Sequence, residues 1–329
     1  MTNQNWKISK NAQIVDTKLE SDNVIIADGV KMNKVHVRAE KLVVEEGADL
    51  SCCKIFSNGI IKIGKKAVIK EDAIINAFNG ITIGERTIID RNVFVGGMQS
   101  EKSEIIIGND CALLYRAYLN PTRKITLGDN VVIGGYSLVF THSAWQNILD
   151  GHPNKFAEVK ISDNVWIPWN VTILPGVTIG KNALIGTGSV VTKSIPANSF
   201  AVGMPAKVKH IKKTRLSETQ KNRLVLEILH EFHGFAENFL KLPNTINKGS
   251  NYAHMMFGNS RLVYNVRINK EVLQENDIVI SFVIPDHIKR QVQWIEFDSL
   301  TSKVGNSVGY HFISFVRRYG MRLKNSIVS

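Results

Sequence analysis

A six-residue rhythm of aliphatic residues runs through the middle of the chain and is clearest from residue 161 to residue 196. An aliphatic residue returns at every sixth position, at Ile161, Ile167, Ile173, Ile179, Ile185 and Val191. Four positions after each of these stands a small or branched residue: Val165, Val171, Val177, Ala183, Ser189 and Ile195. Self-similarity at a short fixed period is typical of a parallel β-helix, in which each repeat buries its apolar side only by stacking on its neighbours. The pattern therefore predicts a β-solenoid in which three hexapeptides make one triangular coil.

The same rhythm occurs upstream in phases separated by breaks, at Ile63, Ile69 and Ile75, then Ile83, Ile89 and Val95, then Ile107, Leu113 and Leu119, then Leu127, Ile133 and Val139. Glycine often follows the aliphatic residue, which indicates a corner that needs positive φ or close backbone approach. Between Val24 and Leu50 the spacing is irregular, so we interpret these residues as degenerate first coils. The alternative, a sandwich of short strands, would alternate with period two.

Three further features set the expected domain organisation. The longest break, residues 140–160, predicts a loop projecting from the rigid solenoid, where function often lies. The solenoid domain is expected to occupy residues 1–211. Ser217 and Gln220 form a capping box that begins a helix, which we expect to close the open end of the solenoid core. Strands are expected at residues 262–268, 278–284, 292–297 and 310–316, so residues 212–329 are interpreted as a helix plus a small α+β domain of unknown role.

Charge and composition narrow the function classes. The chain has 329 residues, 44% of them hydrophobic, and a formal net charge of +12. Residues 1–211 hold 24 Lys+Arg against 19 Asp+Glu, whereas the remaining 118 residues hold 17 against 10. A basic balance favours anionic partners. The start of the chain lacks the apolar segment of a signal peptide, and no stretch approaches a membrane-spanning length, so a cytoplasmic location is expected.

The basic residues near the end of the chain gather around Tyr319, and they are Arg317, Arg318, Arg322 and Lys324. They are either a solvated face or a surface that could dock peripherally on a membrane polysaccharide-synthesis assembly. The tail has no aromatic-glycine nucleic-acid motif, so no nucleic-acid partner is expected.

A set of motifs between residues 128 and 208 carries a family resemblance. The motifs are Gly128-Asp129-Asn130-Val131-Val132-Ile133-Gly134, Thr141-His142, Asp163-Asn164-Val165-Trp166-Ile167, Pro175-Gly176-Val177-Thr178-Ile179-Gly180 and Val202-Gly203-Met204-Pro205-Ala206-Lys207. In order and spacing they resemble the hexapeptide-repeat acyltransferases, specifically the O-acetyltransferase branch that acts on maltose, galactosides and polysaccharides. The resemblance implies an all-β, left-handed parallel β-helix that forms a homotrimer, with acetyl-CoA in the cleft between adjacent subunits.

His142 is the predicted catalytic base. In the family the His of the Thr-His pair removes the acceptor's hydroxyl proton, and imidazole suits this step because its unperturbed pKa lies near neutrality. His152, in the same loop, is a candidate to line the acceptor pocket. Trp166, by the resemblance, lies near the thioester, where its indole N–H could donate to the developing oxyanion. The alternative is an aromatic side chain packed at the trimer interface.

The resemblance also assigns cofactor residues. Backbone groups at Trp169 and Thr187 would contact CoA, and Lys193 and Lys207 would approach its phosphates, unless these lysines are merely solvated. Pro168 replaces the usual glycine and has no N–H, so the pantetheine path there differs from the family pattern.

The acceptor segment also departs from the family pattern. Where the family has an Asn-aromatic-Asn or Asn-aromatic-Asp segment, this chain has Leu114-Tyr115-Arg116. We expect Tyr115 and Arg116 to recognise an acidic sugar, because guanidinium pairs bidentately with carboxylate.

These observations favour an acetyl-CoA-dependent O-acetyltransferase of a bacterial cell-surface polysaccharide, a capsule or O-antigen that could contain sialic acid. No metal is required by this chemistry. Three alternatives stay open: an N-acyltransferase acting on an amino sugar, a zinc carbonic anhydrase on the same solenoid, and a non-catalytic trimeric scaffold with a basic tail. The zinc alternative needs three converging histidines, and the loop offers only His142 and His152.

Overall fold

The computed structural model describes residues 5–143, 146–209, 216–249, 252–265, 273–274, 276–316, 319, 321 and 323–325. The chain divides into two compact units, Met1–Lys212 and Lys213–Ser329. The predicted boundary at Ile211 falls outside the described residues, and so do Arg317, Arg318 and Arg322 of the basic cluster.

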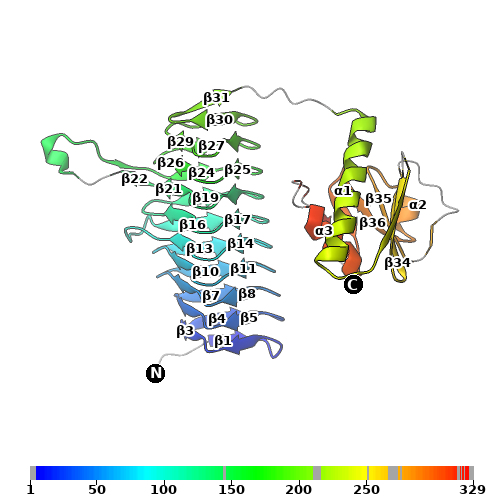
Figure 1. Cartoon of the computed structure of the whole chain (residues 1–329). Helices are drawn as coiled ribbons and strands as arrows, with labels where there is room; N and C mark the ends of the chain where they lie inside the picture. Colours follow the sequence, from blue (N-terminus) through cyan, green and yellow to red (C-terminus); the bar gives the residue numbers. More distant parts are fainter. Residues whose placement is uncertain are drawn as a thin grey trace. The chain divides into compact units, whose positions relative to one another are not determined.

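The first unit is a β-solenoid in which short parallel strands stack coil upon coil, as the sequence predicts (Figure 1). Sheet A stacks β1 (Asn5–Ile8), β4 (Asn23–Ile26), β7 (Lys41–Val44), β10 (Ile60–Ile63), β13 (Gly80–Ile83), β16 (Glu104–Ile107), β19 (Ile125–Leu127), β24 (Val159–Ile161) and β27 (Thr178–Ile179). Sheet B stacks β2 (Gln13–Val15), β5 (Lys31–Asn33), β8 (Asp49–Ser51), β11 (Val68–Ile69), β14 (Ile88–Ile89), β17 (Ala112–Leu113), β20 (Val132–Ile133), β25 (Trp166–Ile167), β28 (Leu184–Ile185), β30 (Phe200–Gly203) and β31 (Ala206–Lys209). Sheet C stacks β3 (Lys18–Glu20), β6 (His36–Arg38), β9 (Lys54–Phe56), β12 (Ile74–Asn76), β15 (Phe94–Val95), β18 (Tyr118–Asn120), β21 (Leu138–Phe140), β26 (Thr172–Ile173) and β29 (Val190–Val191). Each coil therefore runs from sheet A through sheet B to sheet C, with a corner between successive sheets.

The first coils are regular, which corrects the expectation that they are degenerate. Their buried residues Ile26, Met32, Val37 and Val44 are separated by six, five and seven residues. The corner between sheets B and C is one residue shorter here, and the corner between sheets C and A is one residue longer. These two changes break the strict six-residue spacing. They cancel within each coil, so the strands stay in register and the core stays continuous.

Close approach explains the recurring glycines, and positive φ does not. A Cβ on Gly84 would lie 2.4 Å from the carbonyl carbon of Gly108, and one on Gly134 would lie 2.3 Å from that of Pro168. The positive φ values occur two residues later, at Arg86 (53°) and Asn130 (54°) among others. Of the two alternatives that the sequence left open for these glycines, the structure shows close approach.

An asparagine ladder stabilises the corner between sheets A and B. The Asn130 side-chain amide donates to Asn164 at 3.0 Å, Asn164 donates to Asn182 at 3.2 Å, and Asn182 donates to Asn198 at 2.9 Å. Asparagine tolerates the left-handed conformation that this corner needs. The Asp-Asn pairs of the sequence motifs are therefore structural residues of the solenoid.

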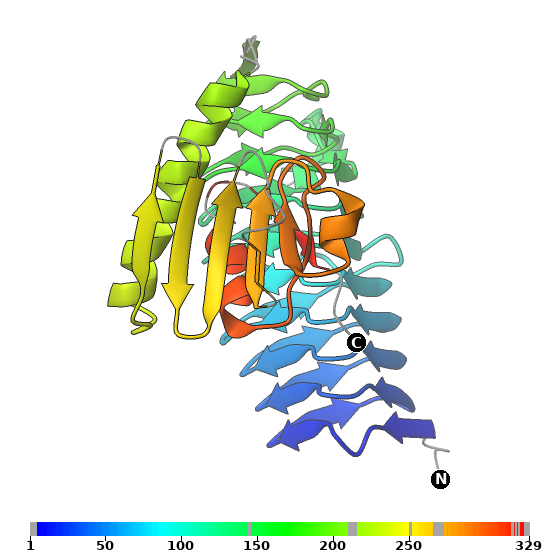
Figure 2. The ribbon, with the colours of Figure 1, turned by 90° about the vertical axis from the view of Figure 1, so that its right-hand side faces the viewer.

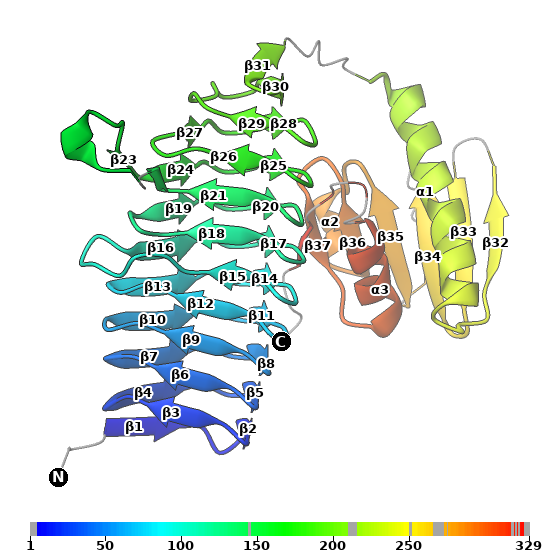
Figure 3. The same cartoon turned by 60° about the vertical axis from the view of Figure 1, so that its left-hand side comes forward.

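Residues 142–156 leave the coil between β21 and β24 and form what we call the arm. β22 (His142–Ser143) pairs antiparallel with β23 (Lys155–Phe156), and the 3₁₀-helix η1 (Ile148–Asp150) follows Asn147, whose side chain caps it. Figures 1 and 3 show the arm extending away from the stack of coils, and the solenoid itself continues above it.

The second unit is a mixed sheet covered by helices on both faces (Figures 2 and 3). Its strand order is β32 (Thr245–Lys248), β33 (Tyr252–Phe257), β34 (Ser260–Asn265), β35 (Asp277–Ser281), β36 (Gln293–Glu296), β37 (Thr301–Lys303) and β38 (Lys324–Asn325). The helices α1 (Glu218–Asn238) and α3 (Ser307–Val316) pack on one face, and α2 (Asp286–Lys289) packs on the other.

Two expectations about the second unit are wrong. The apolar stripe of α1, including Val225 and Phe232, is buried against the second unit's own sheet and does not close the solenoid core. Residues 310–316 belong to α3, because Phe312, Phe315 and Val316 recur at helical spacing and face α1 and the sheet. The capping box of Ser217 and Gln220 is present as predicted.

Candidate active site

His142 begins the arm and lies at the corner between sheets C and A. Its ring stacks on Phe156 of the facing strand, with centroids 6.1 Å apart and planes at 21°. The side chain is half-buried, and its Nδ1 is enclosed with no hydrogen-bond partner among the described residues. An enclosed imidazole held by an aromatic ring has a restricted orientation, which is what a proton acceptor needs.

A buried polar network supports the backbone at this corner. The Thr141 hydroxyl donates to the Asn120 carbonyl at 2.6 Å and accepts from the Arg123 N–H at 2.8 Å. The Asn120 side chain accepts from the Thr122 hydroxyl at 2.7 Å. Asn120, Thr122 and Thr141 are at most 5% exposed, so the Thr of the Thr-His pair fixes the start of the arm to the coil below.

Arg123 places a positive charge beside the arm. Its guanidinium carbon lies 4.7 Å from the centroid of the Phe156 ring, the ring on which His142 stacks. Arg123, Asn120 and Phe156 were not identified from the sequence. Their only signal is strand register, since β18 pairs with β21 and so places Asn120 beside Phe140.

The predicted cofactor residues Trp169 and Thr187 lie one coil apart at the corner between sheets B and C. Both are exposed, and neither N–H donates a hydrogen bond to a described residue. Beside this corner, backbone hydrogen bonds join successive coils. The Gly134 N–H donates to the Ile167 carbonyl at 2.7 Å, and the Gly186 N–H donates to the Ala201 carbonyl at 2.8 Å. Pro168 occupies the intervening place and has no N–H, so the departure noted in the sequence removes one bond between coils.

The two predicted phosphate-binding lysines lie near the end of the solenoid. Lys193 and Lys207 are both exposed, and neither forms an ion pair with a described residue. Their charges are therefore available to a ligand, although exposure alone does not assign them one.

Tyr115 and Arg116 lie at the same corner as Trp169, two coils below it. The Tyr115 ring contacts the Tyr136 ring at a centroid distance of 5.8 Å, and Tyr136 contacts Trp169 at 5.8 Å. The Arg116 guanidinium lies 5.1 Å from the Tyr115 ring and 5.9 Å from the Tyr136 ring. Tyr136, which was not identified from the sequence, therefore connects the predicted acceptor segment to a predicted cofactor residue.

One chain distributes the predicted site residues over separate corners. His142 lies between sheets C and A, whereas Tyr115, Arg116, Trp169 and Thr187 lie between sheets B and C. Trp166, 56% exposed, projects from sheet B, and His152 is exposed beyond η1. No contact joins His142 to any other predicted site residue within the described part of the chain.

Comparison with known proteins identifies the family. Residues 158–193 match the bacterial transferase hexapeptide family, described as six repeats. The chain is 36% identical over 129 residues to the galactoside O-acetyltransferase of Escherichia coli (strain K12), covering 39% of this chain and 62% of that protein. The chain belongs to the hexapeptide-repeat acyltransferase superfamily. Through its match to the galactoside O-acetyltransferase, the chain is similar to the O-acetyltransferase branch of this superfamily.

Solved structures of hexapeptide-repeat acyltransferases also resemble this chain. A maltose O-acetyltransferase of Clostridium difficile 630 is 31% identical, with a TM-score of 0.28, over 47% of this chain and 70% of that one. A hexapeptide-repeat acetyltransferase of Vibrio cholerae is 25% identical, with a TM-score of 0.36, over 40% of this chain and 74% of that one. The chain spans less than two thirds of the length of the curated relatives it matches first.

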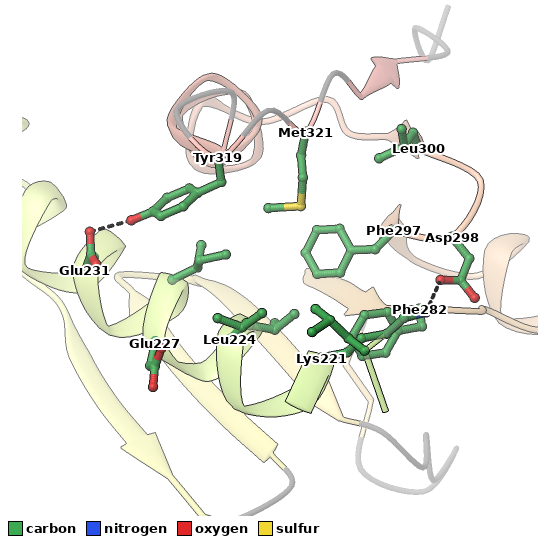
Figure 4. Close-up of a pocket in the computed structure, with 13 residues that line it drawn as sticks. Lys221, Leu224, Glu227, Glu231, Phe282, Phe297, Asp298, Leu300, Tyr319 and Met321 are labelled. Atoms are coloured by element: carbon green, nitrogen blue, oxygen red, sulfur yellow. Dashed lines mark hydrogen bonds and ion pairs between the residues drawn. The ribbon is translucent and has the colours of Figure 1, made fainter. Parts of the chain in front are cut away.

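The second unit contains a separate pocket of about 470 Å³ (Figure 4). Leu224 of α1 and the rings of Phe282 and Phe297, which follow β35 and β36, form apolar walls with Met321. Its charged groups are partnered: Lys221 pairs with Asp298 at 3.4 Å, and the Tyr319 hydroxyl donates to Glu231. No residue that the sequence singled out for chemistry lines this pocket.

The described part of the chain has neither a candidate metal site nor a helix that could span a membrane. No group of three or more His, Cys, Asp or Glu side chains among the described residues could hold a metal ion. None of the helices in the described ranges has both the length and the apolarity needed to cross a bilayer.

Proposed function

We propose that this protein is an acetyl-CoA-dependent O-acetyltransferase acting on a sugar hydroxyl of a bacterial cell-surface polysaccharide. The observation that carries the proposal is His142, held against Phe156 at the base of an arm and one residue after a buried Thr141. The family and the 36% identity to a galactoside O-acetyltransferase support the acyl donor and a hydroxyl acceptor.

The proposed reaction is a direct transfer. His142 accepts the proton of the acceptor hydroxyl as its oxygen attacks the thioester carbonyl carbon. The tetrahedral intermediate collapses with cleavage of the carbon–sulfur bond, and the CoA sulfur leaves and takes up a proton. Trp166 is placed in this proposal as a donor to the oxyanion or the sulfur. The reaction needs no nucleophilic side chain and no metal.

The proposal includes a homotrimer with sites between subunits. Because one chain places His142 and the Trp169–Thr187 corner apart, a second chain would have to bring such a corner to the arm. The unpaired N–H groups of Trp169 and Thr187 would then bind the pantetheine, and Lys193 and Lys207 the phosphates. Tyr115, Arg116 and His152 stay the proposed acceptor residues. We also propose that the protein acts in the cytoplasm, and that its second unit associates with the polysaccharide-synthesis machinery.

The test is thiol release from acetyl-CoA with a panel of acidic and neutral bacterial glycans. Wild type is expected to turn over at least one glycan, and His142→Ala to lower turnover about a thousandfold, because general-base catalysis contributes roughly 10²–10⁴. Leu149→Ala is the control, since this residue of the same arm is 90% exposed and has no proposed role in the site. Equal turnover by wild type and His142→Ala would refute His142 as the base.

Amide formation is the competing outcome. If the acetylated product resisted mild alkali, the acceptor would be an amine and the enzyme an N-acyltransferase. If the protein released no thiol with any glycan or amino sugar, the scaffold alternative would be favoured.

A further inference from the structure

The corner between sheets B and C carries an outward column of side chains that extends the predicted acceptor segment by Tyr136 above it and Arg91 below it. Trp169, Tyr136 and Tyr115 contact one another ring to ring in three successive coils. Tyr136 is 42% exposed and Trp169 is 43% exposed, so their faces are open to a ligand. Gly135 makes room for this arrangement, since a Cβ there would lie 2.6 Å from an atom of the Trp169 ring.

Positive charge accompanies the rings. The Arg116 guanidinium lies over Tyr115 and Tyr136 at 5.1 and 5.9 Å. In the coil below, Arg91 lines a hollow of about 410 Å³ together with Tyr115, Asn92 and Asp72. Asp72 is the one carboxylate among these lining residues, and it accepts a long 3.4 Å hydrogen bond from Asn92. Two guanidinium groups and one carboxylate leave the column basic.

The backbone indicates that these side chains are not incidental. Arg116 and Tyr136 both have a φ of 57°. The coils immediately below use Asp72 and Asn92 at this corner position, and those above use Asn170 and Gly188, which are residue types that tolerate the left-handed region. A bulky residue there costs about 1 kcal/mol or more. Lys34 and Cys52 also take this conformation lower down the same corner, so the cost counts for the column only together with its ring contacts.

The length of the column defines the ligand. Strands of neighbouring coils lie about 4.8 Å apart, so the three steps from Arg91 to Trp169 span roughly 14 Å. That is longer than one pyranose ring. The apolar C–H face of a sugar packs on an aromatic ring, and a sugar carboxylate pairs with guanidinium. Trp169 also belongs to the proposed CoA corner, so a ligand along the column would end beside the acyl donor.

We propose that the acceptor is a chain of acidic sugars rather than a single sugar. The column of Tyr115, Tyr136, Arg116 and Arg91 holds the sugar units that adjoin the one being acetylated. This inference rests on the proposed function for its reaction, but it makes a separate claim about binding.

The test measures binding without turnover. Isothermal titration calorimetry on the full-length His142→Ala protein uses oligomers of sialic acid and of galacturonic acid, their monomers, and a neutral maltooligosaccharide. An acidic oligomer is expected to bind about tenfold or more tightly than its monomer and than the neutral oligomer, with an affinity that falls as salt rises. Binding of CoA serves as the internal reference.

Substitutions that favour the local backbone keep the test informative. Tyr136→Asn and Arg116→Asn suit the left-handed corner, so each is expected to keep or raise the melting temperature. Each should weaken the acidic oligomer about tenfold while leaving CoA binding unchanged. Tyr136→Phe should retain binding. Tyr310→Ala and Arg223→Ala, exposed residues of the second unit, are the matched controls and should change nothing.

The failures can be told apart. Acidic oligomers that bind no better than monomers, or equally well to the variants, would overturn the inference even if the wild-type enzyme turns over a glycan. Oligomer binding without any thiol release would leave the inference standing and refute the proposed function. A Tyr136→Asn protein that loses its oligomeric mass by analytical ultracentrifugation would make the column a subunit contact and overturn the inference.

Discussion

The two units bury their apolar residues in different ways. The core of the solenoid, over the described residues, consists of aliphatic side chains, alanine, cysteine and Met32, with no aromatic ring. The core of the second unit is centred on Phe232, which contacts Phe257, Phe312 and Phe315 at centroid distances of 5.1 to 5.9 Å. Each coil of the solenoid has the same width, so its core positions hold side chains of similar size stacked one above another. In the second unit a few large aromatic rings fill the space between the helices and the sheet.

The difference also concerns where aromatic residues lie. In the solenoid the aromatic side chains lie outside the core. They contact one another at the corner of Tyr115, Tyr136 and Trp169, at the arm, where Phe156 stacks on His142, and along sheet C, where Tyr118 contacts Phe94 and Phe140. Outward aromatics are not required by the core, so they are candidates for binding. The large aromatic side chains therefore build the core of the second unit, whereas those of the solenoid lie outside its core and are open to a ligand or a partner.

The largest effect is expected from Phe232→Ala in the second unit. Removing this fully buried ring should cost about 3–5 kcal/mol, because the surrounding rings cannot close the cavity. Thermal unfolding followed by circular dichroism should show the second unit's transition at lower temperature and the solenoid's transition unchanged. Loss of both transitions together would mean that the units fold as one.

A pair of glycine substitutions is expected to give opposite signs. Gly84→Ala should destabilise the solenoid by about 1–3 kcal/mol, because its Cβ would press on the backbone of the next coil. Gly234 lies in α1, and a Cβ there would meet nothing within 4 Å beyond the helix's own backbone, so Gly234→Ala should stabilise the second unit by about 0.5–1 kcal/mol. Chemical denaturation measures both. A neutral Gly84→Ala would contradict the close-approach explanation.

The stability of the second unit should depend on pH through Glu296. Although burial by itself raises the pKa of Glu296, hydrogen bonds from Ser299, the Ile284 N–H and Lys289 hold that pKa below its usual value. A lowered folded-state pKa contributes stability that is present above the unfolded pKa and is lost as pH falls through the folded value. Glu296→Gln should therefore cost about 1–2 kcal/mol at pH 7 and progressively less below about pH 4. A cost that stayed constant down to about pH 3 would exclude the charge as its cause.

The smallest effect concerns the solenoid's thiols. Burial raises the pKa of Cys53 to about 12 and that of Cys111 to about 11. Both should resist a thiol reagent in the native protein at about pH 8, since the thiolate is the reactive form. Half-buried Cys52 should react first. Rapid labelling of all 3 cysteines would show that the coils open readily.

Sequence reasoning reached the solenoid because its rule is local and repeated. The aliphatic residues at every sixth position from Ile161 to Val191 are all buried. It failed for residues 310–316, where the short apolar run suggests a strand, although Phe312, Phe315 and Val316 stand at helical spacing and pack α3 into the core of the second unit. Sequence reasoning also predicted the wrong packing partner for α1, because an amphipathic helix does not specify which surface will bury its apolar face.

Of the candidate site, too, only part could be identified from the sequence. His142 could be singled out from the Thr-His motif alone, since its chemistry and its place in the longest break are both visible in sequence. Asn120, Arg123, Phe156 and Tyr136 could not. Phe156 meets His142 only through the pairing of β22 with β23, Asn120 and Arg123 bond Thr141 across coils, and Tyr136 contacts Trp169 of the next coil.

The sequence by itself determined the repeat, the coil and the position of the break that becomes the arm, because period and composition are properties of neighbouring residues. The tertiary structure alone decided which outward residues share a corner. A corner is defined by strand register across coils, and insertions such as those before residue 104 and residue 159 change the spacing in sequence without changing that register. The column of Tyr115, Tyr136 and Trp169 is visible only once the coils are stacked.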